Sequence, residues 1–325
     1  MSAPGGPDLN ASGHLDVGDG HSLYWEDWGN PQARTVFLHL HGGPGSQFSD
    51  SHKILYDPTR HRVIFHDQRG CGRSTPFAAT EHNTTQHLIA DIEALRHELG
   101  LGQVVVAGGS WGSALALMYA IAHPDAVHAL LLWSIYLATQ FETDWVNEGR
   151  PSHHLPAEWE RFIGHVPESD RHSGTAVMRF YAAQIRSADA ARSRHFATEW
   201  TLWESALLSI HYDPAALEAE IADDPASIST AILETHYFLA GCFVPEGHVL
   251  QHLPSITHIP AIAVHGRFDL CTPASSAHHL ARAYGPHLSL RWANSGHTRA
   301  DPEMAAALRT AAVELLDDGH QEGTP

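Results

Sequence analysis

The apolar run Val104–Ala107, followed by Gly108-Gly109-Ser110-Trp111-Gly112, is the most informative segment of this 325-residue chain. The run predicts a buried strand, and Ser113–Ala122 predicts a helix that stops before a proline. A serine in the pattern G-x-S-x-G, between a strand and a helix, is typical of a sharp turn that exposes a nucleophilic hydroxyl. The helix N-terminus beyond it favours the negative charge that nucleophilic attack creates.

Strand and helix patterns alternate on both sides of this turn. Strands are predicted at Ser22–Trp28, Thr35–Leu40, Arg62–His66, Val127–Trp133, Ala261–His265 and Leu288–Trp292. Helices are predicted after the N-cap signal Asn83-Thr84-Thr85, and again from Pro302 to about Leu316. This alternation predicts an α/β fold with a mostly parallel sheet and helices on both of its faces.

The alternation is interrupted in the middle of the chain. Residues 137–253 show amphipathic helical segments with many tryptophans and tyrosines and no convincing strand. We therefore expect an α/β core whose first part spans residues 1–136 and whose second part spans residues 255–325. Residues 137–254 are expected to form an inserted helical cap.

Composition narrows the classes of function. With 19 Lys and Arg against 37 Asp and Glu, the formal net charge is −18, which argues against nucleic-acid or anionic membrane partners. Three scattered cysteines argue against a disulfide framework. The sequence shows no signal-peptide pattern and no apolar run of the ~18–20 residues that a membrane helix needs. We expect a soluble, cytoplasmic protein.

Histidine is the one residue type in clear excess, with 28 copies. His153–His154 and His278–His279 are adjacent pairs, and no histidine lies in an H-E-x-x-H or zinc-finger spacing. The pattern therefore predicts no metal site, and most of these histidines are expected at the surface or in satisfied core positions.

A nucleophilic serine needs a base, and the base needs a partner that orients it. When the serine lies in this strand–turn–helix setting, the chain order is Ser, then Asp or Glu, then His. Asp269 and His297 follow the predicted strands Ala261–His265 and Leu288–Trp292, at the strand ends where parallel sheets place their sites. Alone, either could be an ordinary turn residue, but together they predict the triad Ser110, Asp269 and His297.

Attack on a carbonyl also creates an oxyanion, which preorganised donors must hold. The amide of Trp111 is one expected donor. The other is expected from the glycine-rich loop His41-Gly42-Gly43-Pro44-Gly45, in which Gly43 is the predicted donor and His41 frames the loop.

Several motifs together resemble the proline iminopeptidase family of α/β-hydrolases. They are HGGPG at 41–45, DQRGCGRS at 67–74, GGSWGS at 108–113, WE at 203–204, ETHYF at 234–238, GRFDLCTP at 266–273 and SGH at 295–297. The resemblance implies an α/β-hydrolase fold with a helical cap. It also implies that two cap glutamates, Glu204 and Glu234, hold the N-terminal ammonium of the substrate.

The sequence departs from the family around the expected substrate pocket. Trp133 and Tyr136 stand in a segment where the family has Arg-Gly-Ile-Phe, and Val146 replaces an aromatic residue. The resemblance also places Cys271 near the pocket, where it could confer sensitivity to thiol reagents, although a buried apolar role is an equal alternative. The catalytic residues therefore transfer from the family more securely than the preference for proline.

The expected function is that of a serine aminopeptidase that releases an N-terminal residue, expected to be proline, through an acyl-enzyme and without metal or organic cofactor. One alternative is an esterase, amidase or acyltransferase that acts on a small metabolite through an altered acyl pocket. A second is a hydrolase-fold binding protein without turnover. The oligomeric state and the natural substrate stay open.

Overall fold

The computed structural model describes residues 8–211, 213–222, 224 and 226–317. Within these residues one eight-stranded sheet has the order β1-β2-β4-β3-β5-β6-β7-β8. The strands are β1 (Leu9–Asp16), β2 (Ser22–Gly29), β3 (Val36–Leu40), β4 (Arg62–His66), β5 (Val104–Ser110), β6 (Val127–Ile135), β7 (Ala261–Gly266) and β8 (Leu288–Ala293). The pairings from β4 to β8 are parallel, and β1 and β2 pair antiparallel at one edge. The predicted α/β class and mostly parallel sheet are confirmed.

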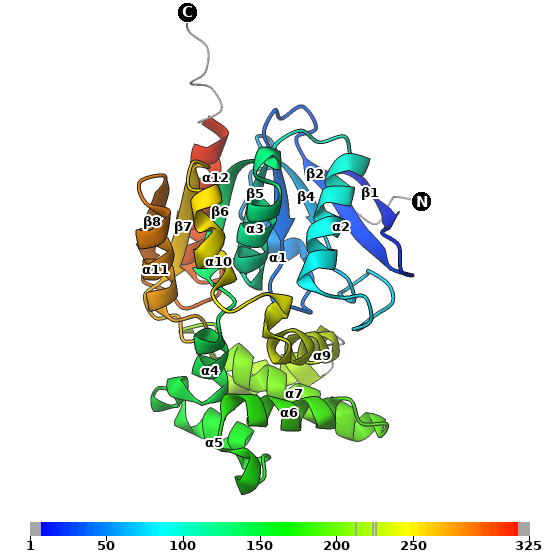
Figure 1. The fold of residues 1–325 in the computed structure, drawn as a ribbon, viewed down its shortest axis with the longest axis vertical. Helices are drawn as coiled ribbons and strands as arrows, with labels where there is room; N and C mark the ends of the chain where they lie inside the picture. The colour runs from blue at the N-terminus through cyan, green and yellow to red at the C-terminus, as the bar shows by residue number, and fades with distance from the viewer. Residues whose placement is uncertain (1–7, 212, 223, 225, 318–325) are drawn as a thin grey trace, which may run out of the picture.

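Helices cover both faces of the sheet (Figure 1). They are α1 (Asp50–Lys53), α2 (Thr85–Glu98), α3 (Trp111–Ala122), α10 (His248–His252), α11 (Ala274–Tyr284) and α12 (Pro302–Asp317). Helices α2, α3, α10 and α11 share one apolar cluster with the sheet, and α12 shares the cluster on the opposite face. Central strands such as β3 and β7 are buried along their whole length because both of their faces are covered.

Six α-helices in the described part of residues 140–239 form a helical layer at one end of the sheet (Figure 1). The helices are α4 (Gln140–Asn147), α5 (Pro156–Gly164), α6 (Gly174–Ile185), α7 (Ala190–Ala206), α8 (Pro214–Ala222) and α9 (Ala226–Leu239). They enclose a core of their own, in which Phe162, Tyr181, Trp200 and Trp203 are almost completely buried. From Tyr237 onward the buried apolar side chains belong to the two clusters on the faces of the sheet. The division into a core and a cap at residues 137 and 254 stays a prediction, and residues 1–7 and 318–325 lie outside the described part.

Short 3-10 helices complete the described secondary structure. They are η1 (Pro124–Ala126), η2 (Arg150–His153), η3 (Glu168–Asp170), η4 (Gly241–Phe243) and η5 (Leu253–Ser255). In the described part of the chain, no helix is long and apolar enough to span a membrane.

Two differences from the sequence-based expectations affect the edge strand and the central turn. Strand β1 was not expected, because LNASGHLD has almost no β-branched or aromatic residue and most of its side chains are exposed. The strand forms because its backbone hydrogen-bonds to β2, although its composition does not favour a strand. Strand β5 also runs through Ser110, and α3 begins at Trp111 rather than at Ser113, so no loop residue separates the serine from the helix.

Candidate active site

Ser110 occupies the turn between β5 and α3, with the backbone angles φ 57° and ψ −129°. A positive φ is costly for a residue with a side chain, by about 1–3 kcal/mol, and such strain is typical of functional turns. The neighbouring glycines make the turn possible. A Cβ on Gly112 would collide with the carbonyl oxygen of Leu40, and a Cβ on Gly109 would collide with the indole of Trp133. The turn is therefore packed directly against the ends of β3 and β6.

Asp269 and His297 meet beyond the ends of β7 and β8. The distance from His297 Nδ1 to Asp269 Oδ2 is 2.9 Å, and both residues are buried. The amides of Cys271 and Thr272, with the Thr272 hydroxyl, also donate to the Asp269 carboxylate. Burial alone would raise the pKa of Asp269, but the charge and hydrogen bond of His297 outweigh it and lower the pKa. Asp269 therefore stays ionised and fixes the orientation of the imidazole.

The Ser110 hydroxyl makes no hydrogen bond to His297 in this structure, although both residues are described. Such contacts are often long in an enzyme without substrate and tighten only in the reacting complex. The glycine-rich loop at residues 41–45 is close to the serine, since a Cβ on Gly42 would lie 3.9 Å from Ser110 Oγ. The structure thus brings the nucleophile and the glycine-rich loop together.

Two backbone amides near Ser110 are available as donors. Among the described residues, the Gly43 amide donates no hydrogen bond. The Trp111 amide is the first of α3, where no intrahelical acceptor exists. Gly43 has a φ of +112°, and a Cβ at this position would lie 2.6 Å from the amide nitrogen of Gly45. A side chain therefore could not be accommodated at the loop position expected to face an oxyanion.

The two cap glutamates lie close enough to hydrogen-bond to each other. Glu204 is in the last turn of α7 and Glu234 is on α9, and the Trp200 indole donates to Glu234 Oε2 at 2.7 Å. Burial and the neighbouring Glu204 carboxyl raise the pKa of Glu234 well above its usual range. Burial also raises the pKa of Glu204, although the hydrogen bond with Glu234 and, to a smaller extent, the charge of His297 offset part of this effect. A positive charge between the two glutamates would lower both pKa values, because it would offset the repulsion between two ionised carboxylates.

The helical layer is tied to the loops that carry Asp269 and His297. The carbonyl of Leu208, just beyond α7, accepts from the amides of His297 at 2.7 Å and Thr298 at 2.8 Å. The Ser209 hydroxyl donates to Asp301 Oδ1 at 2.8 Å. On the Asp269 loop, the Trp145 indole donates to the Leu270 carbonyl at 2.9 Å. The segment that carries Glu204 is thus bonded to the histidine loop.

Residues 35–298 match the family model described as the alpha/beta hydrolase fold. Proline iminopeptidase of Neisseria gonorrhoeae is 40% identical over 307 residues, which cover 94% of this chain and 96% of the relative. The chain belongs to the proline iminopeptidase family. The Arabidopsis thaliana proline iminopeptidase is 39% identical over 308 residues, which cover 94% of this chain and 80% of that protein.

Solved structures share the fold of this family member at low sequence identity. Proline iminopeptidase from Mycobacterium smegmatis has a TM-score of 0.61 at 19% identity, covering 95% of this chain and 98% of that chain. An esterase from Exiguobacterium antarcticum has a TM-score of 0.64 at 18% identity, covering 94% of this chain and all of the esterase. The predicted α/β-hydrolase fold and the predicted family are confirmed.

The residues at which this chain departs from the proline iminopeptidase pattern lie in three different environments. Trp133 belongs to the cluster on the α12 face of the sheet, which has no member from the helical layer. Tyr136 packs against Phe238, and its hydroxyl lies 3.6 Å from Cys242 Sγ. Val146 is in the core of the helical layer, and its carbonyl accepts from the Trp203 indole at 3.3 Å. Their roles in substrate binding stay predictions.

Cys271 lies on the Asp269 loop, where its amide donates to the Asp269 carboxylate. Burial raises the pKa of its thiol well above the usual range, and the carboxylates of Asp269, Glu204 and Glu234 raise it further. The thiol is therefore neutral at physiological pH and is a weak nucleophile. The Cys271 thiol is thus close enough to Asp269, Glu204 and Glu234 to be affected by the charge of all three.

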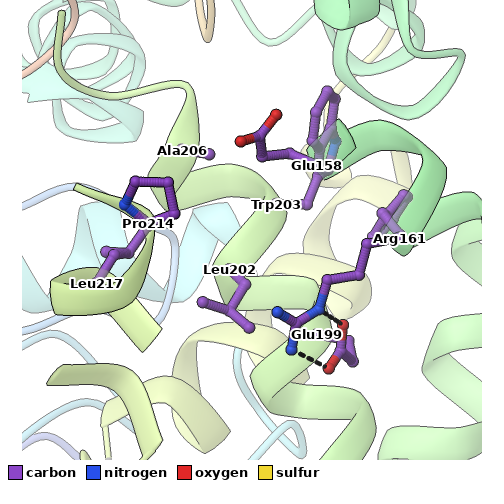
Figure 2. A pocket seen from close by; sticks show the side chains of 9 residues that line it. Glu158, Arg161, Glu199, Leu202, Trp203, Ala206, Pro214 and Leu217 are labelled. Atoms are coloured by element: carbon purple, nitrogen blue, oxygen red, sulfur yellow. Dashed lines mark hydrogen bonds and ion pairs between the residues drawn. The ribbon is translucent and has the colours of Figure 1, made fainter. Parts of the chain in front are cut away.

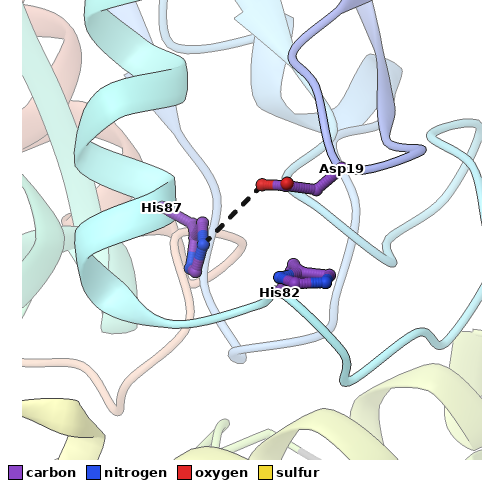
Figure 3. A group of neighbouring side chains, drawn as sticks. All are labelled: Asp19, His82 and His87. Atoms are coloured by element: carbon purple, nitrogen blue, oxygen red, sulfur yellow. Dashed lines mark ion pairs between the residues drawn. The ribbon is translucent and has the colours of Figure 1, made fainter.

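Two other features of the molecule lie outside this site. A cavity of about 50 Å³ lies between α5, α7 and α8, beside the ion pair of Arg161 with Glu199 (Figure 2). Asp19, His82 and His87 gather at the start of α2 (Figure 3), and His165, His195 and Glu199 form a second such group. In each group the carboxylate already pairs with an arginine. Asp19 lies 3.7 Å from the Arg69 guanidinium, and Glu199 lies 2.7 Å from the Arg161 guanidinium. Neither group is therefore suited to a cation.

Some residues that shape the site were not expected from the sequence. The Thr272 hydroxyl donates to the Asp269 carboxylate, and the Ser134 hydroxyl donates to the His297 carbonyl. The Leu208 carbonyl accepts from the His297 amide. Gln68 contacts both segments that carry the candidate oxyanion donors, the glycine-rich loop and the start of α3. DQRGCGRS at 67–74 was the only signal for Gln68, and nothing local distinguishes Leu208 or Ser134.

Proposed function

We propose that this chain is a serine aminopeptidase that releases an N-terminal residue, preferably proline, from short peptides. The observation that carries the proposal is the pair Glu204 and Glu234. Glu204 lies close enough to His297 to be affected by its charge, and the segment just after it is bonded to the histidine loop. A carboxylate pair at a fixed distance from a nucleophile selects substrates whose cleaved bond follows a free amine. The relatives from Neisseria gonorrhoeae, Arabidopsis thaliana and Xylella fastidiosa are named proline iminopeptidases, which supports the same activity.

In the proposed reaction the Ser110 oxygen bonds to the carbonyl carbon of the N-terminal residue, and the hydroxyl proton passes to His297. The Gly43 and Trp111 amides donate to the oxyanion. As the C–N bond breaks, His297 returns the proton to the leaving amine. A water molecule then attacks the acyl-enzyme and gives a proton to His297. The ester bond to Ser110 breaks, His297 returns the proton to the Ser110 oxygen, and the free amino acid is released.

Ionised Asp269 stabilises the imidazolium that forms in both steps, because its lowered pKa keeps it charged while it accepts from Nδ1. The cap carboxylates bind the substrate ammonium, which in an N-terminal proline is a protonated secondary amine with two N–H donors. Binding of this cation favours ionisation of both glutamates.

A panel of aminoacyl arylamides, each with and without an N-acetyl group, tests the proposal. We expect prolyl arylamide to be hydrolysed faster than the alanyl and leucyl compounds, and acetylation to abolish turnover. Equal rates for acetylated and free substrates would overturn the role of the glutamates. A faster alanyl or leucyl compound would overturn the preference for proline, and full activity of Ser110→Ala would overturn the nucleophile.

The alternative of an esterase or amidase with an altered acyl pocket rests on Trp133, Tyr136 and Val146. Their burial in three separate clusters gives it no specific support. The same panel, extended with p-nitrophenyl esters of small acids, separates the two functions, since an esterase would not need the free amine.

A further inference from the structure

Gln68 bridges the two segments that carry the candidate oxyanion donors. Its side-chain Nε2 donates to the His41 carbonyl at 2.8 Å. Its side-chain Oε1 accepts from the Trp111 indole Nε1 at 3.0 Å. The residue is 2% exposed, and one carboxamide thus connects the glycine-rich loop with the serine turn.

The sheet order explains why this position can make both contacts. Strands β4, β3 and β5 are neighbours, and Gln68, His41 and Trp111 each lie just beyond the end of one of them. Gln68 therefore reaches across the end of the middle strand to the serine turn. Only a side chain with a donor and an acceptor on the same planar group can make both contacts from this place.

The glycine-rich loop is fixed by a second contact with the Gln68 backbone. The Gln68 amide donates to His41 Nε2 at 3.0 Å, so the imidazole proton resides on Nδ1, which donates to the Gly42 carbonyl at 2.9 Å. Burial lowers the pKa of His41 and keeps the ring in this neutral form. The Gly42–Gly43 peptide supplies the candidate donor. Its carbonyl is held by the His41 ring, and Gln68 in turn holds both the ring and the carbonyl of His41.

The residue next to Gln68 supports it in turn. Asp67 is completely buried, accepts from the Phe48 amide at 3.0 Å and pairs with the Arg73 side chain at 2.8 Å. The Gln68 side chain has its donor and its acceptor satisfied, and neither contact is to solvent. This leaves its position little freedom.

We propose that Gln68 is a positioning residue that holds the amides of Gly43 and Trp111 at the separation an oxyanion requires. It touches neither substrate nor the reacting atoms and acts through His41 and Trp111. The inference rests on the proposed function, because it takes the Ser110 acyl transfer as the reaction. Its specific consequence is that Gln68 stabilises the tetrahedral state and leaves ground-state binding unchanged.

The test compares Gln68→Met with a matched control, Asn83→Leu. Asn83 is also a buried carboxamide, which donates to the Arg69 and Ala79 carbonyls and accepts from the Tyr237 hydroxyl, but it contacts neither His41 nor Trp111. Both variants should therefore lose similar thermal stability. Gln68→Glu serves as a second variant, since it keeps the acceptor for Trp111 and loses the donor to His41.

Three quantities are measured for each variant: kcat and KM for prolyl arylamide, inhibition by proline, and inhibition by pyrrolidine-2-boronic acid. The boronic acid forms a tetrahedral adduct when Ser110 oxygen bonds to boron and the hydroxyl proton passes to His297. Proline forms no such adduct. We expect Gln68→Met to lower kcat about 10- to 100-fold, since complete removal of one donor costs about 10²–10³-fold. KM and inhibition by proline should change less than threefold.

Boronic-acid affinity should fall in proportion to kcat/KM for Gln68→Met, whereas Asn83→Leu should keep kcat within threefold. Unchanged kcat in Gln68→Met, unchanged boronic-acid affinity, or an equal loss of kcat in Asn83→Leu would each overturn the proposal. Trp111→Phe keeps the backbone amide and removes the indole donor. The combined Gln68→Met, Trp111→Phe variant should lose less than the product of the two single losses, and a full product would refute the link through Trp111.

Failure of the proposed function would look different. In that case the unmodified protein would not hydrolyse prolyl arylamide at all. The same variants can then be compared on p-nitrophenyl acetate, because any acyl transfer by Ser110 creates an oxyanion between the same two amides.

Discussion

Lowering the pH from 7.5 to 5 is expected to destabilise this fold through its buried histidines. His66 is 1% exposed, and burial lowers its pKa to about 3. His52 is 6% exposed, and burial together with the charge of Arg299 lowers its pKa to about 2. Both rings are therefore neutral in the folded protein at pH 5, whereas in the unfolded chain a histidine binds a proton below about pH 6.5.

The direction of the effect follows from where the proton is bound. Below pH 6.5 and above the folded pKa values, the unfolded chain holds one more proton per histidine, so the free energy of unfolding falls as the pH falls. The stabilisation is complete above pH 6.5 and is lost below it. The loss is about 1.4 kcal/mol per pH unit for each histidine, or about 4 kcal/mol for both between pH 6.5 and 5. This is a large part of the ~5–15 kcal/mol typical of native proteins.

The assay is urea denaturation followed by tryptophan fluorescence at several pH values between 7.5 and 5. His66→Leu tests the assignment, because Nδ1 of His66 has no hydrogen-bond partner that the change would remove. Its free energy of unfolding should fall less steeply with pH, by about 1.4 kcal/mol per unit. His258→Leu is the control, since this side chain is exposed and its slope should not change. Equal slopes for His66→Leu and the unmodified protein would refute the reasoning.

Three further predictions concern the site. Glu234→Gln and Glu204→Gln should each raise KM for free prolyl arylamide about 10- to 100-fold, as expected for the loss of one charge-assisted hydrogen bond, and unchanged steady-state kinetics in both variants would contradict this. Cys271 should react slowly with iodoacetamide at pH 8, because burial and the neighbouring carboxylates raise its pKa, and mass spectrometry should show faster labelling in Glu234→Gln. Ser209→Ala removes the hydrogen bond from the Ser209 hydroxyl to Asp301. It should lower kcat about fivefold with little change in the melting temperature, which is roughly the effect of one lost hydrogen bond. A melting temperature that falls without any change in kcat would show that the contact is purely structural.

The sequence alone determined the features that depend on short stretches of chain. The strand–turn–helix around Ser110 follows from apolar patterning and from glycines within a few residues of each other, and the structure confirms the strand and the helix. The positions of Asp269 and His297 after strands follow from the same local patterns. In a parallel sheet the carboxyl ends of strands lie on one edge, which is why local patterns could predict that these side chains would meet.

Tertiary structure alone decided which side chains hold the site in shape. Gln68 and Trp111 are 43 residues apart, and the Ser134 hydroxyl donates to His297 across 163 residues. Such contacts depend on strand order and on how the helical layer lies against the sheet, and neither leaves a periodic signal in the sequence. Burial likewise appears only in the folded chain. It separates His52 and His66 from the exposed histidines among the 28 and makes them sensitive to acid.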